Sequence, residues 1–254
     1  MQKVYRVEDG CTLDGSPAIE VAARVLREGG LALIPTETVY GLAVAVSAFS
    51  GTPAATLSTS GDAPAPLVNG CSVPAEGSGY RRIFDLKRRD LTQTVPWLVG
   101  GASDLDVYGR NIDVRTRALA QSLWPGALTL IVPAAPNVPK FMCAADGTVA
   151  LRASASPVVA ALVRACGCPL ACTSANTHGV PAPASFDAVE PRILAGVDIA
   201  LDAGATPCQD ASTIVSFPSG TLKIVRQGAL PTSAIDRALT GASAPAGAGS
   251  ARGR

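Results

Sequence analysis

The sequence predicts one mixed α/β domain, and three observations support this prediction. Apolar residues make up 48% of the chain, which is enough for a sizeable core. Short apolar runs of the kind that form buried strands recur along the chain, and segments with helical spacing of apolar residues lie between some of them. At 254 residues the chain is long enough for one large domain or two small ones, and single α/β domains of this size are common. We therefore expect a sheet with helices packed on it.

The first predicted helix covers residues 17–28 and carries a start signal. Ser16 is a suitable N-cap, and Pro17 is favoured at the first helical position. The apolar run at 31–34 then predicts a buried strand, and the polar segment 35–38 predicts a turn after it. In open α/β sheets ligands bind at the carboxyl ends of strands. We therefore expect this turn to lie near a ligand.

The later part of the chain contains further apolar runs and helical patterns of similar length. The predicted strands are at 128–132, 148–151, 169–172, 197–201, 212–217 and 222–225, and the predicted helices are at 80–88, 113–123, 157–165 and 231–239.

Two segments lack any apolar period. Residues 47–79 are rich in Ser, Gly, Pro, Ala and Thr and contain only two charged residues, so we expect a flexible surface insertion. Residues 241–254 are rich in Ala, Gly and Ser, and we expect a disordered C-terminal tail. The domain should therefore extend over residues 1–240.

Charge and hydropathy exclude several classes of protein. The formal net charge is +1, so the overall field would not hold the chain to nucleic acid or to a membrane surface. No run of about 18 apolar residues is present, and no apolar run near the start resembles that of a signal peptide. Seven cysteines, an odd number, favour a reducing compartment. We expect a cytoplasmic protein that does not contact a membrane.

Common catalytic and metal-binding motifs are also missing. The sequence has no G-x-x-x-x-G-K-[ST] loop, no G-x-G-x-x-G after a strand and no G-x-S-x-G elbow. His178 is the only histidine, and its spacing from Cys166, Cys168 and Cys172 matches no common zinc pattern. We therefore expect no metal ligands from the protein.

Two polar segments are candidates for binding a phosphorylated ligand. Lys87 and Arg89 end a short basic helix and suit phosphate oxygens, although a solvated charged face would look the same. Ser174 and Asn176 directly follow an apolar run, and in an extended segment both would project to one side. A polar turn or a helix cap is the alternative interpretation of that segment.

Taken together, these segments resemble the YrdC/TsaC family of threonylcarbamoyl-AMP synthases. The resemblance covers about residues 17–230 apart from the insertion. The matching blocks, in the family's order, are I-P-T-E-T-V-Y-G-L from Ile34, I-F-D-L-K-R-R from Ile83, W-P-G-A-L-T from Trp124, T-V-A-L-R from Thr148, T-S-A-N from Thr173 and, more weakly, S-T-I-V from Ser212 with Arg226 and Gly228.

The resemblance implies a twisted mixed sheet around a deep cleft and a reaction of L-threonine, bicarbonate and ATP with Mg²⁺. The products would be threonylcarbamoyl-AMP and pyrophosphate, in the first step of threonylcarbamoyladenosine formation in tRNA. The implied catalytic residues are Lys87, Arg89, Ser174 and Asn176, which would also bind ATP together with Thr148, Ser212 and Arg226, while Thr36, Arg152 and Ser174 would bind threonine. Implied partners are tRNA or double-stranded RNA and a downstream threonylcarbamoyl transferase of the TsaD type.

Three positions depart from the family pattern. Asp90 replaces a proline, Gly100 stands where an apolar run usually ends in histidine, and Ala182 replaces a small hydroxyl residue. A substrate contact of the family would then be missing. Two alternatives therefore stay open: a non-catalytic protein of this family that binds RNA or a nucleotide, and a module that forms a carbamoyl adenylate from another carbamoyl donor.

Overall fold

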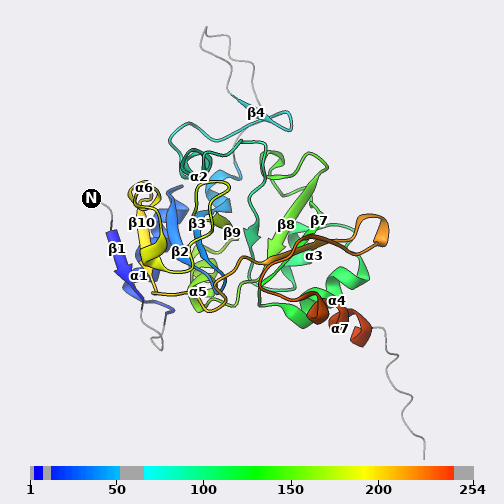
Figure 1. The fold of residues 1–254 in the computed structure, drawn as a ribbon. Coiled ribbons are helices and arrows are strands. Elements are labelled where there is room, and N and C mark those ends of the chain that lie inside the picture. Colours follow the sequence, from blue (N-terminus) through cyan, green and yellow to red (C-terminus); the bar gives the residue numbers. More distant parts are fainter. Residues whose placement is uncertain (1–2, 8–12, 52–65, 243–254) are drawn as a thin grey trace, which may run out of the picture.

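One mixed sheet twists through the molecule and carries helices on both faces (Figure 1). The computed structural model describes residues 3–7, 13–51 and 66–242. Within them the sheet has ten strands in the order β1-β10-β2-β3-β9-β6-β8-β7-β11-β12. These are β1 (Lys3–Arg6), β2 (Ala32–Pro35), β3 (Tyr40–Ala45), β6 (Trp97–Leu98), β7 (Leu128–Pro133), β8 (Thr148–Arg152), β9 (Leu170–Ser174), β10 (Ile199–Asp202), β11 (Thr213–Ser216) and β12 (Lys223–Arg226). The predicted α/β class is confirmed.

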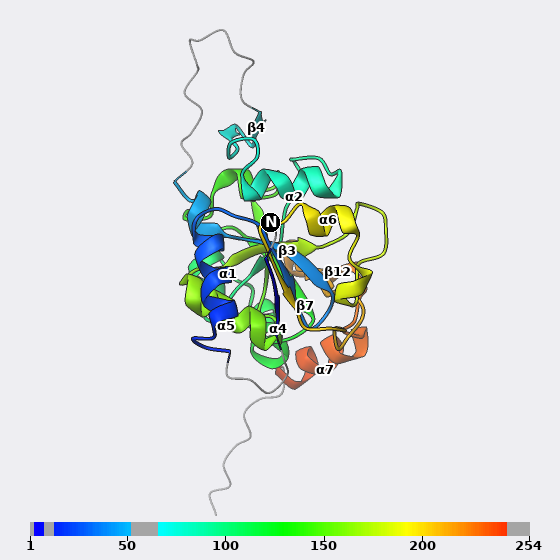
Figure 2. The same ribbon diagram turned by 90° about the vertical axis from the view of Figure 1, so that its left-hand side faces the viewer.

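Helices α1 and α5 lie side by side on one face of the sheet (Figure 2). Helix α2 packs on β3 from the other face, and α4 packs against both β7 and α7. The α-helices are α1 (Pro17–Arg27), α2 (Gly79–Lys87), α3 (Asp104–Tyr108), α4 (Val114–Leu123), α5 (Pro157–Cys166), α6 (Pro191–Ala195) and α7 (Thr232–Ala242).

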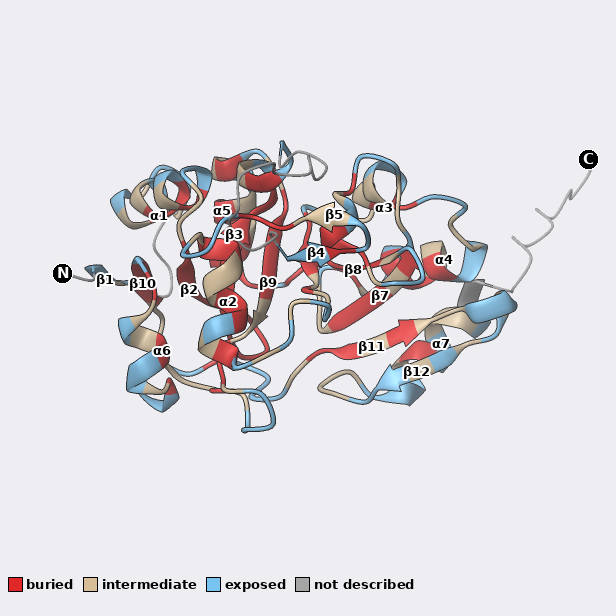
Figure 3. Ribbon diagram, turned by 90° about the horizontal axis from the view of Figure 1, so that it is seen from above, coloured by how far each residue is buried: buried red, intermediate tan, exposed pale blue. Residues whose placement is uncertain are grey.

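Two hydrophobic cores arise from the alternation of side chains along the strands. Leu42 and Val44 of β3 join the core under α2, whereas Ala43 and Ala45 join the core under α1 and α5. The central strands are buried along their length, and the outer strands β1 and β12 are largely exposed (Figure 3). Helices α1 and α5 do not extend over β8, β7 and β11. On the same face of the sheet, these three strands line pockets instead.

Local signals place the first helix as predicted. The Ser16 side chain accepts a hydrogen bond from the backbone N–H of Ile19 at 3.4 Å, and Pro17 is the first helical residue. Helix α1 ends at Arg27, one residue before the predicted end. Gly29 follows with a φ of 83°, a left-handed conformation that glycine adopts without steric strain.

The predicted insertion at 47–79 is too long, because its described parts are ordered. Phe49, Val68 and Val73 are buried in the core under α2. Strands β4 (Leu67–Val68) and β5 (Cys71–Ser72) form a hairpin whose two-residue turn is Asn69-Gly70, with φ angles of 52° and 73°. The Asn69 amide also donates to the carbonyl oxygens of residues 140 and 143. Residues 52–65 lie outside the described residues.

The predicted C-terminal tail begins later than expected. Helix α7 includes residues 241 and 242, and residues 243–254 lie outside the described part of the chain. In that described part, no helix combines the length and apolar character needed to cross a membrane.

Candidate active site

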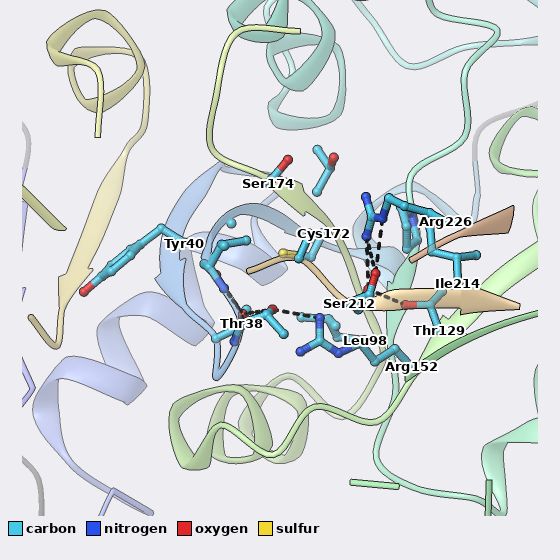
Figure 4. Close-up of a pocket in the computed structure, with 16 residues that line it drawn as sticks. Thr38, Tyr40, Leu98, Thr129, Arg152, Cys172, Ser174, Ser212, Ile214 and Arg226 are labelled. Carbon is cyan, nitrogen blue, oxygen red and sulfur yellow. Dashed lines mark hydrogen bonds between the residues drawn. The ribbon is translucent and has the colours of Figure 1, made fainter. Parts of the chain in front are cut away.

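A pocket at the end of β8 brings together most of the predicted site residues (Figure 4). We call it the Arg152 pocket. Its wall consists of the turn between β2 and β3 together with parts of β3, β6, β7, β8, β9, β11 and β12. The predicted site residues that line it are Thr36, Arg152, Ser174, Ser212 and Arg226. Its cavity volume is about 80 Å³, so a nucleotide must extend beyond it.

The Thr36 hydroxyl is used inside the turn between β2 and β3. It donates to the carbonyl oxygen of Val39 at 2.7 Å and accepts from the backbone N–H groups of Thr38 and Val39. The hydroxyls of Thr36 and Thr38 are 2.8 Å apart. Since the Thr36 proton goes to Val39, the Thr38 hydroxyl is the donor of that pair. Thr36 therefore shapes the pocket wall, and its predicted contact with threonine stays a prediction.

The Arg152 guanidinium is buried and held by three groups. Its Nε donates to the carbonyl oxygen of Gly126 at 3.1 Å, and its Nη1 donates to the Thr38 hydroxyl at 3.0 Å. Its Nη2 forms an ion pair with Glu37 Oε1 at 2.5 Å. Burial raises the pKa of Glu37, but Arg152 and the Ser154 hydroxyl lower it by more, so the net change is downward and the pair stays charged at neutral pH.

Ser212 and Arg226 form the opposite wall of the pocket. The Arg226 Nη2 donates to the Ser212 carbonyl oxygen at 2.8 Å and to its hydroxyl at 3.2 Å. The Ser212 hydroxyl also lies 2.8 Å from the hydroxyl of Thr129 on β7. Burial lowers the pKa of Arg226 from its usual range, but an arginine stays protonated at neutral pH. This wall therefore offers a cation and two hydroxyls to a ligand.

Lys87 lies behind the pocket wall, at the end of α2. Its ammonium donates to the carbonyl oxygens of Ser174 and Asn176 at 2.5 and 2.9 Å and to Asn176 Oδ1 at 3.1 Å. The Ser174 hydroxyl is 3.4 Å away. Burial, followed by the charge of Arg89, lowers the pKa of Lys87 to about 8. The structure thus joins Lys87 to Ser174 and Asn176, and its contact with phosphate stays a prediction.

Arg89 lies between the Arg152 pocket and a second, larger pocket. Its guanidinium donates to the Thr94 carbonyl oxygen and, at 3.4 Å, to the Thr173 hydroxyl. Thr173 lines the Arg152 pocket, whereas Thr94 lines the second one. The Arg89 guanidinium also lies 6.0 Å from the centre of the Phe84 ring. A phosphate chain passing from one pocket to the other would come close to Arg89.

Thr148 lies in that second pocket, which we call the Thr148 pocket, and not in the Arg152 pocket. Alternate residues of a strand face one side, so Thr148, Ala150 and Arg152 share a face of β8. On β7, Ile131 pairs with Ala150 and Pro133 pairs with Thr148. All four line the Thr148 pocket, whose volume is about 520 Å³. The two pockets therefore follow one another along the same face of the sheet.

Contacts with α6 fix the loop after Asn176, and no sequence pattern predicts them. Thr177 donates from its backbone N–H and its hydroxyl to the carboxylate of Glu190, both at 2.8 Å. Arg192 donates to the Thr177 hydroxyl and to the carbonyl oxygen of Leu86, both at 2.7 Å. These residues tie the loop to the end of α2, which carries Lys87.

The cysteines provide no metal centre in the described chain. Cys172 lines the Arg152 pocket, and burial raises the pKa of its thiol to about 12, so it stays protonated. Within the described ranges, no group of three or more His, Cys, Asp or Glu side chains could hold a metal ion.

Comparison with known proteins gives consistent matches. The family model Sua5_yciO_yrdC, described as "Telomere recombination", matches residues 70–228. A threonylcarbamoyl-AMP synthase of Xanthomonas campestris pv. campestris (strain B100) is 34% identical over 211 residues, which cover 78% of this chain and 95% of that protein. A threonylcarbamoyl-AMP synthase of Pyrococcus abyssi is 28% identical over 221 residues, which cover 87% of this chain and 57% of that protein. The chain therefore spans just over half the length of the Pyrococcus protein.

Solved structures match over most of the chain. The crystal structure of P. abyssi Sua5 complexed with L-threonine gives a TM-score of 0.76 at 26% identity, covering 92% of this chain and 60% of that one. The crystal structure of E. coli YciO gives a TM-score of 0.72 at 19% identity, covering 92% of this chain and all of that one. The second match shows the fold alone.

Proposed function

The chain belongs to the Sua5/YciO/YrdC family, and on that premise we propose that it is a threonylcarbamoyl-AMP synthase. In the proposed reaction the amino group of L-threonine and bicarbonate form a carbamate and water. A carbamate oxygen then attacks the α-phosphorus of ATP, and pyrophosphate leaves. The enzyme would therefore be a nucleotidyltransferase.

The observation that carries this proposal is the pair of adjoining pockets on one face of the sheet. The Arg152 pocket has a buried cation and room for a small ligand, while the Thr148 pocket has the larger volume that a nucleotide needs. Arg89 lies where they adjoin, near the place that a triphosphate between them would occupy. Threonine in the first pocket and ATP along the second would bring the amine and the α-phosphate together.

Each wall of the Arg152 pocket would have its own part in the reaction. Arg152 would pair with the carboxylate of threonine through its charge and the N–H of Nη1 that Thr38 does not use. Ser212 and Arg226 would bind the nucleotide from the other wall. Arg89 would stabilise the charge that builds on the leaving pyrophosphate. Lys87 would hold Ser174 and Asn176 in place and, on rearrangement, reach a phosphate.

We propose that Mg²⁺ enters with ATP. The residues that line the Arg152 pocket include no carboxylate and those that line the Thr148 pocket include one, Asp146, whereas Mg²⁺ prefers several oxygen ligands such as carboxylates, phosphates and water. The protein's side chains alone therefore do not form a suitable site, whereas triphosphate oxygens and water would complete one. The ion would neutralise phosphate charge.

The wider context of this activity is proposed from the family. We expect the protein to act in the cytoplasm, in the first step of threonylcarbamoyladenosine formation in tRNA, and to supply a downstream threonylcarbamoyl transferase of the TsaD type. Contact with tRNA or double-stranded RNA remains a separate proposal, and retention on immobilised tRNA at physiological salt would test it.

Pyrophosphate release tests the proposed activity. The protein would be incubated with ATP, Mg²⁺, L-threonine and bicarbonate, and each substrate would be omitted in turn. Release should require both threonine and bicarbonate. Release without threonine would contradict the proposal, and release that depends on carbamoyl phosphate would favour a carbamoyl-adenylate-forming module. No release together with tight RNA binding would favour a non-catalytic family member.

A further inference from the structure

Glu37 is a buried carboxylate that none of the proposed roles uses. It lies in the turn between β2 and β3, and only 8% of its surface is exposed. Burying a charge is unfavourable unless it is paired and hydrogen-bonded. Its partner, Arg152, is the cation proposed to bind threonine.

Glu37 is held from several sides. Its Oε1 pairs with Arg152, and its Oε2 accepts a hydrogen bond from the Ser154 hydroxyl. The backbone of Ala155, at the start of α5, also hydrogen-bonds the carboxylate. The Glu37 carbonyl oxygen accepts from the backbone N–H of Cys208 at 2.8 Å. These contacts fix both the backbone and the carboxylate, so Glu37 can fix its partner in turn.

The contacts of Arg152 leave part of its guanidinium for a ligand. Of its five N–H donors, one each is directed to Gly126, Thr38 and Glu37. Of the two donors that remain, the one on Nη2 is buried away from solvent, so the one on Nη1 is left for a ligand in the pocket. Arg152 lines the Arg152 pocket, whereas Glu37 does not and instead lines a neighbouring apolar pocket with Pro157. Glu37 therefore lies behind the guanidinium and does not face the substrate.

We propose that Glu37 is a positioning residue for the amino-acid substrate, an inference that rests on the proposed function. By pairing with the buried Nη2, it fixes the rotation of the guanidinium so that the remaining N–H of Nη1 is left for the pocket. A carboxylate held there receives this charge-assisted hydrogen bond and lies beside the guanidinium charge. The site thus selects amino acids with a free α-carboxylate. Glu37 also offsets the burial of the Arg152 charge before substrate binds.

The test compares two ligands that differ only at the carboxyl group, L-threonine and L-threoninamide. Calorimetry would give the Kd of each ligand for the wild-type protein and for Glu37→Gln. In the variant we expect threonine to bind about 10-fold or more weakly, because the guanidinium is no longer fixed, and threoninamide to change little. The preference for threonine over threoninamide should therefore fall. Glu37→Asp, which keeps the charge, should restore part of the preference.

Asp198→Asn is the matched control. Asp198 pairs with Arg82 and accepts from the backbone N–H of Leu31 at 2.7 Å, but it lines neither the Arg152 pocket nor the Thr148 pocket. Its loss should lower the melting temperature and leave the preference for threonine unchanged. Unchanged preference in both Glu37 variants, or an equal loss in Asp198→Asn, would overturn the inference. The wild-type protein distinguishes failure of this inference from failure of the proposed function. If the proposed function is wrong, the wild-type protein will release no pyrophosphate in response to threonine.

Discussion

Replacement of Lys87 by methionine should damage both the stability and the activity of this protein. Lys87→Met keeps the length of the side chain and removes only the ammonium group. That group is the donor for the carbonyl oxygens of Ser174 and Asn176 and for Asn176 Oδ1. Only 3% of the Lys87 surface is exposed, so water has little access to take the place of the ammonium.

The contacts of Lys87 set the size of the expected loss. A hydrogen bond from a charged donor contributes about 1.5–3 kcal/mol, so the three contacts together contribute about 4.5–9 kcal/mol. Burial of the ammonium offsets several kcal/mol of this, and we expect a net loss of about 2–4 kcal/mol. For a domain of this size each kcal/mol lowers the melting temperature by about 2–4 °C, so the decrease should be roughly 5–15 °C.

Thermal unfolding followed by circular dichroism would measure the shift, and pyrophosphate release below the transition would measure turnover. Turnover should fall at least about 100-fold, because the position of Ser174 and the charge near the phosphates are lost together. The matched control is Lys140→Met, a lysine outside the Arg152 pocket and the Thr148 pocket. A melting temperature within about one degree of the wild-type value would show that the Lys87 contacts do not stabilise the fold. Unchanged turnover would show that the active site lies elsewhere.

Three other measurements address the same site. Turnover should fall as pH rises through about 8, where Lys87 loses its proton. The free energy of unfolding should rise between pH 8 and the unfolded pKa of 10.5, because the unfolded state still binds a proton there. In Lys87→Arg both trends should be absent, and their persistence would assign them to another group. Arg226→Ala should raise the KM for ATP by about 10-fold or more and leave the Kd of threonine, measured by calorimetry, within about twofold. Weaker binding of threonine with an unchanged KM for ATP would instead place Arg226 in the threonine site. Arg192→Ala should lower kcat by roughly three- to tenfold, because the Thr177 loop is no longer tied to α2, and an unchanged kcat would leave α6 a purely structural element.

Local signals in the sequence predicted the elements that depend on them. Helix α5, predicted at 157–165, runs from Pro157 to Cys166, with Ser156 as its N-cap and Gly167 in the left-handed conformation after it. The predicted strand at 148–151 is β8, one residue longer than expected. These elements have caps or buried apolar runs that can be recognised within a short window.

Elements that depend on distant partners were missed. Strand β6 (Trp97–Leu98) has two residues and exists because β8 and β9 pair with it on either side. Strand β3 (Tyr40–Ala45) is buried on both faces, so it shows no polar alternation, and Gly41 weakens its strand signal. The β4–β5 hairpin did carry a local signal, the Asn69-Gly70 pair, but the composition of the surrounding segment hid it.

The candidate site was predicted only in part, because some of its residues follow local strand signals and others depend on distant contacts. Arg152 and Ser174 follow the ends of predicted strands by one and two residues, and the fold brings those ends to one pocket. Thr148 lies at the other end of β8, which places it in the adjoining pocket. Glu37 was missed because its importance comes from Arg152, far along the chain, and spacing within the turn does not show that contact.

Incorporation of labelled bicarbonate tests the central claim most directly. The protein would be incubated with ATP, Mg²⁺, L-threonine and ¹³C-bicarbonate in buffer freed of unlabelled carbon dioxide and bicarbonate. The products would be separated and their masses measured by mass spectrometry. We predict an adenylate that contains threonine and one ¹³C atom, formed in equal amount with pyrophosphate. Pyrophosphate release without such an adenylate, or an adenylate that lacks the label, would contradict the assignment of this pair of pockets to threonylcarbamoyl-AMP synthesis.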